Sequence, residues 1–148
     1  MGMIDSEVIF SNGQTPTAIG DTASTNVYNT GGANGQGDAG QTSENLWLNA
    51  RCTAAATSAG SATVQAVVQD SADNATFADV TTGAVVALAN ITAGSTLLAI
   101  QPPPGMRQYW RIVYRIGTAV LTAGSFDAYV SNTLQRNVAR PSGIPAVG

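Results

Sequence analysis

The sequence predicts an all-β fold in which antiparallel strands form a sandwich or a barrel. Lys is absent, Glu and Leu are scarce, and Thr, Val and Gly are plentiful, a composition that favours strands and turns over helices. Short apolar or alternating segments recur along the chain, and turn residues separate them at intervals of about 8–12 residues. The 148 residues are enough for one domain with its own core.

Nine segments are expected to be strands. Each combines β-branched, aromatic or other apolar residues with polar neighbours, and Gly, Pro, Asn, Asp or Ser separate them. In chain order they are 7–11, 25–29, 45–53, 62–70, 77–81, 84–90, 96–101, 108–117 and 125–132. As an alternative, 77–81 and 84–90 form one bent strand.

Alternation is clearest in segments 62–70 and 108–117, where successive side chains point to opposite faces. In the first segment, one face carries Val64, Ala66 and Val68, and the other carries Thr63, Gln65 and Val67. In the second, the apolar face carries Trp110, Ile112, Tyr114 and Ile116. The opposite face carries Tyr109, Arg111, Val113 and Arg115. The apolar faces are expected to line the core.

The arginines of segment 108–117 allow two interpretations. Arg107, Arg111 and Arg115 recur every four residues, as on one side of a helix. A strand is favoured because the segment is short, rich in β-branched and aromatic residues, and bounded by Gly105 and Gly117. The arginines then lie on the wetter face, either solvated and paired with Asp or exposed as a contact surface for an acidic partner.

Composition excludes several classes of function. The chain has no His and no Lys, so a Ser-His-Asp triad, a His metal site and a lysine Schiff base are excluded. A single cysteine, Cys52, permits neither an internal disulfide nor a thiolate cluster, and we expect it to be a small buried residue. A net charge of −3 argues against a nucleic-acid partner. No cofactor, no metal and no catalytic activity are expected.

Two local patterns imitate functional motifs. The run GQGDAG at 35–40 matches a dinucleotide-binding pattern, but a polar turn and a strand follow it where a helix is required. We interpret 31–40 as a surface loop. The acidic cluster around Asp70, Asp73 and Asp79 lacks the spacing of a calcium loop, and Asx turn chemistry explains Asp73 and Asn74.

The two ends of the chain differ from the middle. No apolar run approaches the length of a membrane span, so no membrane partner is expected. Residues 135–148 contain two prolines and little apolar content, which predicts an extended, non-sheet tail after a domain spanning 1–134. We expect this tail to dock on a neighbouring chain through Arg136, Arg140 and Ile144.

The second half of the chain carries a recognisable string, PPPGMRQYWRIVY at 102–114, followed by GTA at 117–119 and LTAGSF at 121–126. Further matches are VQAVVQDS at 64–71, Asp73, Asn74 and Phe77, and IFS at 9–11. Over roughly residues 4–132 the chain resembles the cement, or decoration, proteins of tailed bacteriophages, in particular the type found on Bordetella phage heads. The loop 31–40 and the tail are peculiar to this chain.

The resemblance implies a jelly-roll β-sandwich with extended termini and no catalytic site. It implies a structural virion protein that sits on the outer capsid surface and is assembled in the host cytoplasm. Its partners would be the major capsid protein, whose subunits it bridges, and copies of itself, with a homodimer favoured over a trimer. Candidate contact residues are Arg111, Arg115, Arg136, Arg140 and Ile144. The alternative is a jelly-roll carbohydrate-binding module of a phage tail or adhesin.

Overall fold

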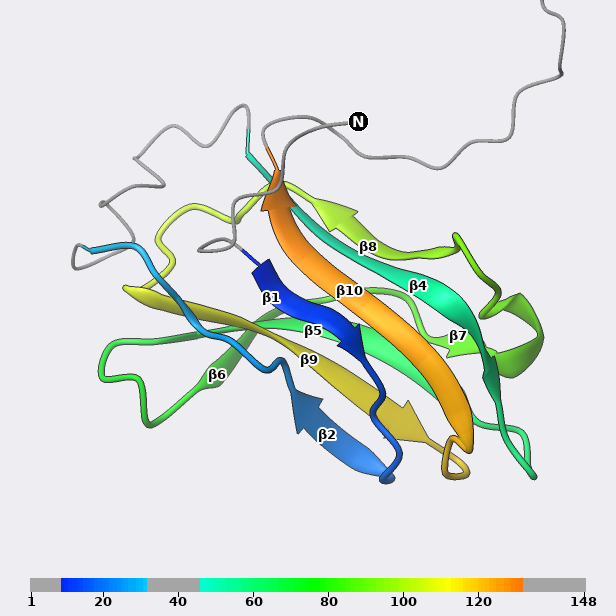
Figure 1. The fold of residues 1–148 in the computed structure, drawn as a ribbon. Coiled ribbons are helices and arrows are strands. Elements are labelled where there is room, and N and C mark those ends of the chain that lie inside the picture. The colour runs from blue at the N-terminus through cyan, green and yellow to red at the C-terminus, as the bar shows by residue number, and fades with distance from the viewer. Residues whose placement is uncertain (1–8, 32–45, 132–148) are drawn as a thin grey trace, which may run out of the picture.

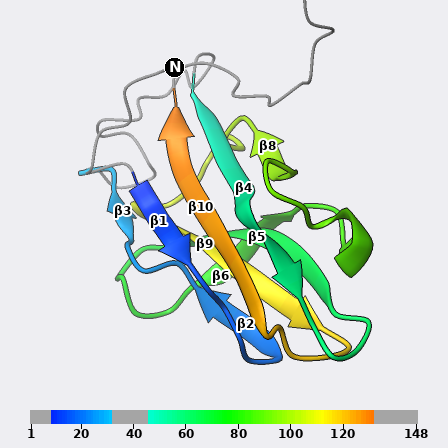
Figure 2. The ribbon, with the colours of Figure 1, turned by 45° about the vertical axis from the view of Figure 1, so that its right-hand side comes forward.

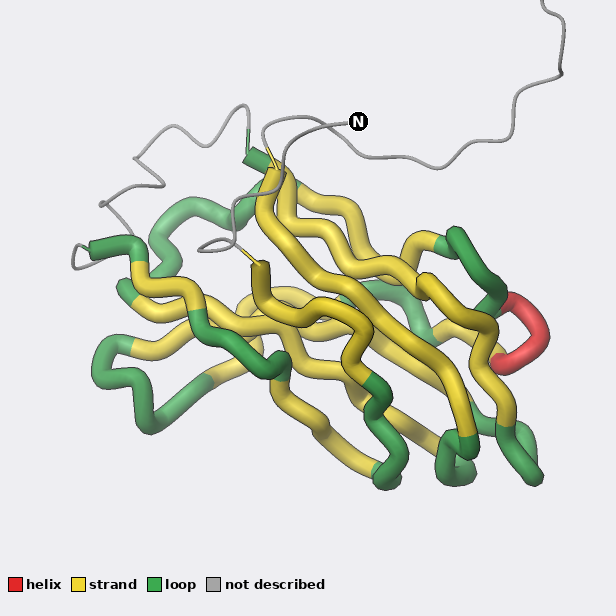
Figure 3. Tube along the Cα trace, in the orientation of Figure 1, coloured by secondary structure: helices red, strands yellow, loops and turns green. Residues whose placement is uncertain are grey.

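A computed structural model of the protein describes residues 9–31 and 46–131. Within these residues the elements are strands and one short 3₁₀ turn (Figures 1 and 3). The strands are β1 (Ile9–Gln14), β2 (Gly20–Ala23), β3 (Tyr28–Asn29), β4 (Trp47–Thr57), β5 (Thr63–Ser71), β6 (Ala78–Thr82), β7 (Val86–Ala87), β8 (Thr96–Ile100), β9 (Tyr109–Gly117) and β10 (Ala123–Ser131). The 3₁₀ turn, η3, spans Leu88–Asn90.

The strands form two antiparallel sheets that pack face to face (Figures 1 and 2). One sheet has the order β1-β10-β4-β8, and the other has the order β2-β9-β5-β6, with β3 paired to β9 and β7 paired to β5. The chain crosses repeatedly between the sheets, and this order of strands is that of a jelly roll. The prediction of an antiparallel jelly-roll sandwich is confirmed.

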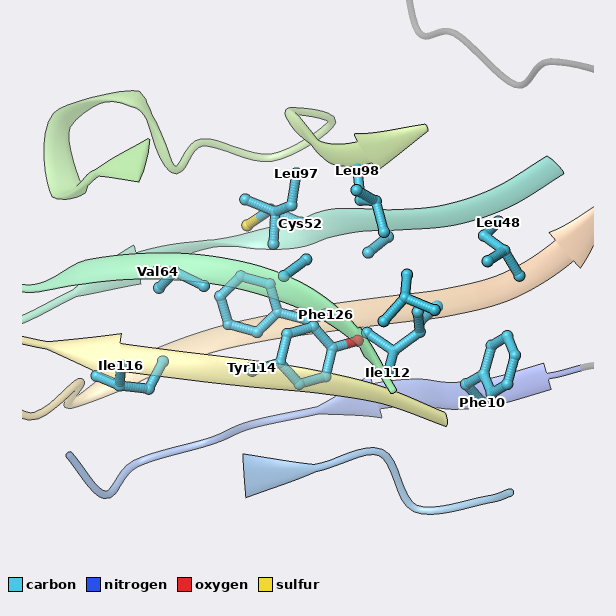
Figure 4. Packing of buried hydrophobic residues seen from close by; sticks show 14 of the residues in the cluster. Phe10, Leu48, Cys52, Val64, Leu97, Leu98, Ile112, Tyr114, Ile116 and Phe126 are labelled. Atoms are coloured by element: carbon cyan, nitrogen blue, oxygen red, sulfur yellow. The ribbon is translucent and has the colours of Figure 1, made fainter. Parts of the chain in front are cut away.

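The core lies between the two sheets and is almost entirely apolar (Figure 4). Both sheets contribute large side chains with less than 2% of their surface exposed, among them Phe10, Leu48, Ile112, Tyr114 and Phe126. The rings of Tyr114 and Phe126 meet across the core at a centroid distance of 5.3 Å. Burial of such side chains supplies the main free energy that holds the sheets together.

The predicted alternation of β5 and β9 is confirmed. Residues of the expected apolar faces belong to the buried core: Val64, Ala66 and Val68 on β5, and Trp110, Ile112, Tyr114 and Ile116 on β9. Val67 and Val113 are paired in register on the opposite face, yet they are 0% and 1% exposed. The outer face of this sheet is therefore better covered than a simple alternation of core and solvent predicts.

Two expected strands differ from the structure. Within 25–29 only Tyr28–Asn29 is a strand, because Ser24 is buried and its hydroxyl donates to the Asn26 carbonyl, which bends the chain. The preceding strand β2 lacks an apolar pattern and was not expected. Within 84–90 the strand is limited to Val86–Ala87, and the 3₁₀ turn follows it. The two segments 77–81 and 84–90 form separate strands on β5.

The expected extended termini lie outside the described residues. Strand β1 begins at Ile9 and β10 ends at Ser131, so the sandwich accounts for the described part of the proposed 1–134 domain. None of the described residues form a helix with the length and hydropathy that a membrane span requires.

Candidate contact surfaces

The outer face of the six-stranded sheet carries Arg111 and Arg115, as the alternation of β9 predicts. Their register partners on β5 are Gln69 and Gln65, and the pair Val67–Val113 lies between these two rungs. Long arginine stems can cover apolar surface while their charged heads stay in water. The arginine stems therefore explain why Val67 and Val113 are buried although they are not part of the core between the sheets. We call this surface the arginine face.

Arg115 pairs with two carboxylates, one on β2, which neighbours β9, and one on β6, which lies beyond β5 in the same sheet. Its Nε donates to Oδ1 of Asp21 at 2.7 Å and its Nη2 to Oδ2 at 2.9 Å, a two-point fork. The same Nη2 donates to Oδ2 of Asp79 at 3.1 Å. The hydrogen bonds raise the pKa of Arg115 above its ordinary value and lower the pKa of Asp21. The pKa of Asp79 is also lowered, chiefly by a hydrogen bond from Gln69.

Arg111 has different surroundings four residues earlier on the same strand. Its Nε donates to Oε1 of Gln69 at 2.8 Å, and its guanidinium carbon lies 3.9 Å from the centroid of the Phe77 ring. Burial lowers the pKa of Arg111 below its ordinary value, although the group stays protonated at neutral pH. The expected Asp-paired arginine face is thus confirmed for Arg115, whereas Arg111 is held by an amide and an aromatic ring.

Arg107 does not belong to the arginine face. It precedes β9, and its side chain pairs with Asp70, with 2.6 Å between Nη2 and Oδ1. The regular spacing of Arg107, Arg111 and Arg115 is therefore not a continuous stripe on one surface.

The outer face of the four-stranded sheet carries a second polar cluster. Asn49 and Arg51 project from β4 beside Asp127 and Tyr129 of β10, which are their register partners. The guanidinium of Arg51 lies 5.4 Å from the centroid of the Tyr129 ring and its Nη2 lies 3.5 Å from Oδ2 of Asp127. Asn49 and Tyr129 are both only 2% exposed, although they are on an outer face.

Within residues 9–31 and 46–131, two polar atoms of this cluster have no hydrogen-bond partner. The amide nitrogen of Asn49 donates to the Trp47 carbonyl and to the Ser131 hydroxyl, but its Oδ1 accepts nothing. The Nε of Arg51 is also buried without an acceptor. A buried polar group without a partner costs free energy, and an ordered water commonly satisfies such an atom. We call Asn49, Arg51, Asp127 and Tyr129 the amide face.

The acidic cluster is divided among separate structural roles. Asp73 accepts hydrogen bonds from the amides of Ala75 and Thr76 at 2.9 and 2.8 Å, which confirms the Asx turn and lowers the pKa of Asp73 to about 2. Asp70 pairs with Arg107, and Asp79 with Arg115 and Gln69. Over 9–31 and 46–131, no three acidic or cysteine side chains are grouped as a metal site would require.

Cys52 is fully buried, as expected for a structural cysteine. Its thiol donates to the Ala54 carbonyl at 2.9 Å, and burial raises the pKa of the thiol. A thiol with a raised pKa is a poor nucleophile at neutral pH. This residue therefore packs in the core.

Several expected sites cannot be placed. Arg136, Arg140 and Ile144 lie outside the described residues, as does the loop 31–40 after Gly31. Conversely, the sequence analysis did not predict the amide face, although the alternation of side chains along β4 could have located it. Trp47, Asn49 and Arg51 alternate there with Leu48, Ala50 and Cys52, and the second set is buried in the core.

Residues 10–130 match the family model Bbp16, which covers most of the chain. The jelly roll and its two polar outer faces thus belong to a phage virion protein. The chain is a member of the Bordetella phage Bbp16 family of capsid cement proteins. A search among curated proteins finds no match to this sequence.

Proposed function

We propose that this virion protein binds the outer surface of an assembled phage head and stabilises it by bridging major capsid subunits. Family membership supports a location in the virion, which the host cytoplasm would assemble. A protein that binds two adjacent subunits at once adds binding free energy only while those subunits stay together in the shell. This role requires surfaces that bind rather than groups that react.

The observation that carries the proposal is that both outer faces of the sandwich hold fixed polar side chains. The arginine face carries Arg111 and Arg115 on one sheet, and the amide face carries Asn49 and Arg51 on the other. The core separates the two faces, so one molecule can bind a capsid subunit through the arginine face and a second copy through the amide face. The pair then presents two arginine faces, which can bridge two capsid subunits.

The amide face supports a homodimer. The Arg51 side chain is 40% exposed and lies against the Tyr129 ring and Asp127, so its outer part can reach a partner chain. Across a twofold axis the amide faces of two copies would meet, and each Arg51 would contact the other copy by symmetry. Dimerisation also makes the second attachment to the shell intramolecular, which increases avidity.

A catalytic role draws no support from the described residues. The thiol of Cys52 is buried, and the carboxylates of Asp21, Asp70, Asp73 and Asp79 all have structural hydrogen bonds. We therefore propose a purely structural protein that needs no cofactor. The tail 135–148, with Arg136, Arg140 and Ile144, is proposed as an additional contact with a neighbouring chain.

The test compares phage heads assembled with and without this protein, heated in parallel with a dye that reports released DNA. A protein that binds only the assembled shell stabilises each site by about 2.7 kcal/mol when its free concentration is a hundred times its dissociation constant. We expect decorated heads to release DNA at a higher temperature. Equal release temperatures with complete decoration would refute the stabilising role, and absence of the protein from purified heads would refute the capsid location.

The carbohydrate-binding alternative has weaker support. Sugar rings stack on exposed aromatic faces, but all nine aromatic side chains lie among the described residues and are buried or partly buried. The Phe77 ring is already stacked beneath Arg111. Binding to a broad glycan array, together with failure to co-sediment with heads, would favour this alternative over the cement role.

A further inference from the structure

Arg111 differs from the other arginines within the described residues. Arg51 pairs with Asp127, Arg107 with Asp70, and Arg115 with both Asp21 and Asp79. Over residues 9–31 and 46–131, no carboxylate lies within ion-pair distance of Arg111. The only hydrogen bond of Arg111 in these ranges is the one from Nε to Gln69, so its N–H groups at Nη1 and Nη2 have no protein acceptor there.

The same guanidinium is held firmly on its other sides. Its Nε is anchored on Gln69 Oε1, and Gln69 is itself fixed because its Nε2 donates to Asp79 Oδ1 at 2.6 Å. The Phe77 ring covers one face of the guanidinium at 3.9 Å. These contacts restrict the rotation of a side chain that would otherwise lose considerable entropy on binding. The edge that remains is the pair of η nitrogens.

We propose that this edge of Arg111 receives a carboxylate side chain of the capsid subunit, and so forms the ion pair that docks the arginine face. This inference rests on the proposed function and names the chemistry of its partner. The planar guanidinium suits a carboxylate because two parallel N–H groups bond two oxygens. The pKa direction agrees, since burial disfavours the charged form of Arg111 and an added carboxylate would favour it.

Arg115 does not compete for this role. Its fork is occupied by Asp21, and Asp79 accepts a further bond from Nη2. A partner carboxylate would have to displace two carboxylates of this chain. Nucleic acid is also a poor partner, because the chain carries a net charge of −3 and repels a polyanion.

The first test measures co-sedimentation of full-length variants with heads that lack this protein. Arg111→Lys keeps the charge but loses the fork, and Arg111→Gln loses both. Arg107→Lys is the control, because it makes the same change at an arginine that lies outside the arginine face, and a melting curve checks that this variant is folded. We expect affinity to fall about tenfold or more for both Arg111 variants, with the larger loss in Arg111→Gln, and to change less than about threefold for Arg107→Lys.

The second test needs no variant. Phenylglyoxal modifies accessible guanidinium groups, and mass spectrometry locates the modified residue. We expect Arg111 to be modified in the free protein and protected on heads.

Two outcomes would contradict this inference and leave the proposed function standing. Either wild-type protein binds heads and the Arg111 variants bind within about twofold of it, or Arg111 reacts as fully on heads as in the free protein. Failure of the wild-type protein to bind heads refutes the proposed function itself, and tighter binding to DNA than to heads overturns the choice of partner.

Discussion

Asp70 holds Arg107 through both the backbone and the side chain. Its Oδ2 accepts the Arg107 amide N–H at 2.8 Å, and its Oδ1 accepts Nε and Nη2 at 2.9 and 2.6 Å. The Arg107 carbonyl in turn accepts the indole N–H of Trp110 at 2.6 Å. The most recognisable string of the sequence, 102–114, therefore fixes the entry of the chain into β9, and the first of its two arginines, Arg107, is a structural residue.

The first prediction is that Asp70→Asn destabilises the sandwich. The Asp70 side chain is only 8% exposed, and the change removes charge-assisted hydrogen bonds to Arg107. The expected loss is about 1.5–3 kcal/mol in the free energy of unfolding, measured by urea denaturation. Asp21→Asn is the control, because the Asp21–Arg115 pair is more exposed and should cost less than about 1 kcal/mol. Equal losses in the two variants would contradict a special role for Asp70.

The second prediction concerns the hydroxyl pair inside the sandwich. Ser11 and Tyr114 share a hydrogen bond of 2.5 Å between β1 and β9, in a region where both residues are buried. Tyr114→Phe leaves the Ser11 hydroxyl without a partner, and we expect it to cost about 1–3 kcal/mol. Adding Ser11→Ala should recover part of this loss in a double-mutant cycle. Strictly additive losses would show that the two hydroxyls do not interact.

The third prediction is that the contribution of Asp73 to stability depends on pH. The pKa of Asp73 is about 2 in the folded protein against an ordinary 3.8, because the amides of Ala75 and Thr76 stabilise the carboxylate. A lowered folded pKa means that this stabilisation is complete above about pH 3.8 and is lost as the pH falls through about 2. Asp73→Asn should therefore differ from wild type in melting temperature at pH 5, and the difference should shrink towards pH 2. A difference that stays constant over this range would refute the assignment.

Local pattern was sufficient to predict much of the fold, and the reason is visible in β9. Its side chains alternate between the core and the outer face, so the period alone assigned Trp110, Ile112 and Tyr114 to the interior. The same reasoning failed at 84–90, where Leu88–Asn90 turns as a 3₁₀ segment after a two-residue strand. Ala87 precedes this turn without any side-chain cap, so no sequence signal marks it.

The side-chain pairing on the two outer faces could be predicted only in part, because the paired residues are distant in sequence. Arg111 and Arg115 lie on the same face of β9. Arg111 nevertheless bonds Gln69, whereas Arg115 bonds Asp21, which is 94 residues away from it in the sequence. Only the register of β2 on β9 brings Asp21 to Arg115. Sequence reasoning therefore placed Arg111 and Arg115 on the correct face, but it could not tell which of the two is paired with a carboxylate.

The fourth prediction tests the homodimer on the amide face. Arg51→Gln removes the guanidinium that would contact the other copy, and the side chain is 40% exposed, so little stability should be lost. We expect the dimer dissociation constant to rise about tenfold, measured by sedimentation equilibrium. The control is Thr53→Ala, two residues along the same strand and on the same face, which should leave the dimer unchanged. A wild-type protein that is monomeric at tens of micromolar would refute the dimer, and equal constants for Arg51→Gln and wild type would refute this face.

The fifth prediction concerns the tail. The buried core cluster extends from Phe10 to Val130, so a chain truncated after Asn132 should fold and melt close to the full chain. The tail would cost about 1–2 kcal/mol per residue to order, and binding can repay this only through contacts such as Arg136, Arg140 and Ile144. We therefore expect truncation to weaken attachment to heads, and Arg136→Gln with Arg140→Gln in the full chain to reproduce part of the loss. Co-sedimentation at several salt concentrations separates the contributions, because screening weakens the arginine contacts and leaves the burial of Ile144. Equal decoration of heads by the truncated and full-length proteins would refute docking of the tail.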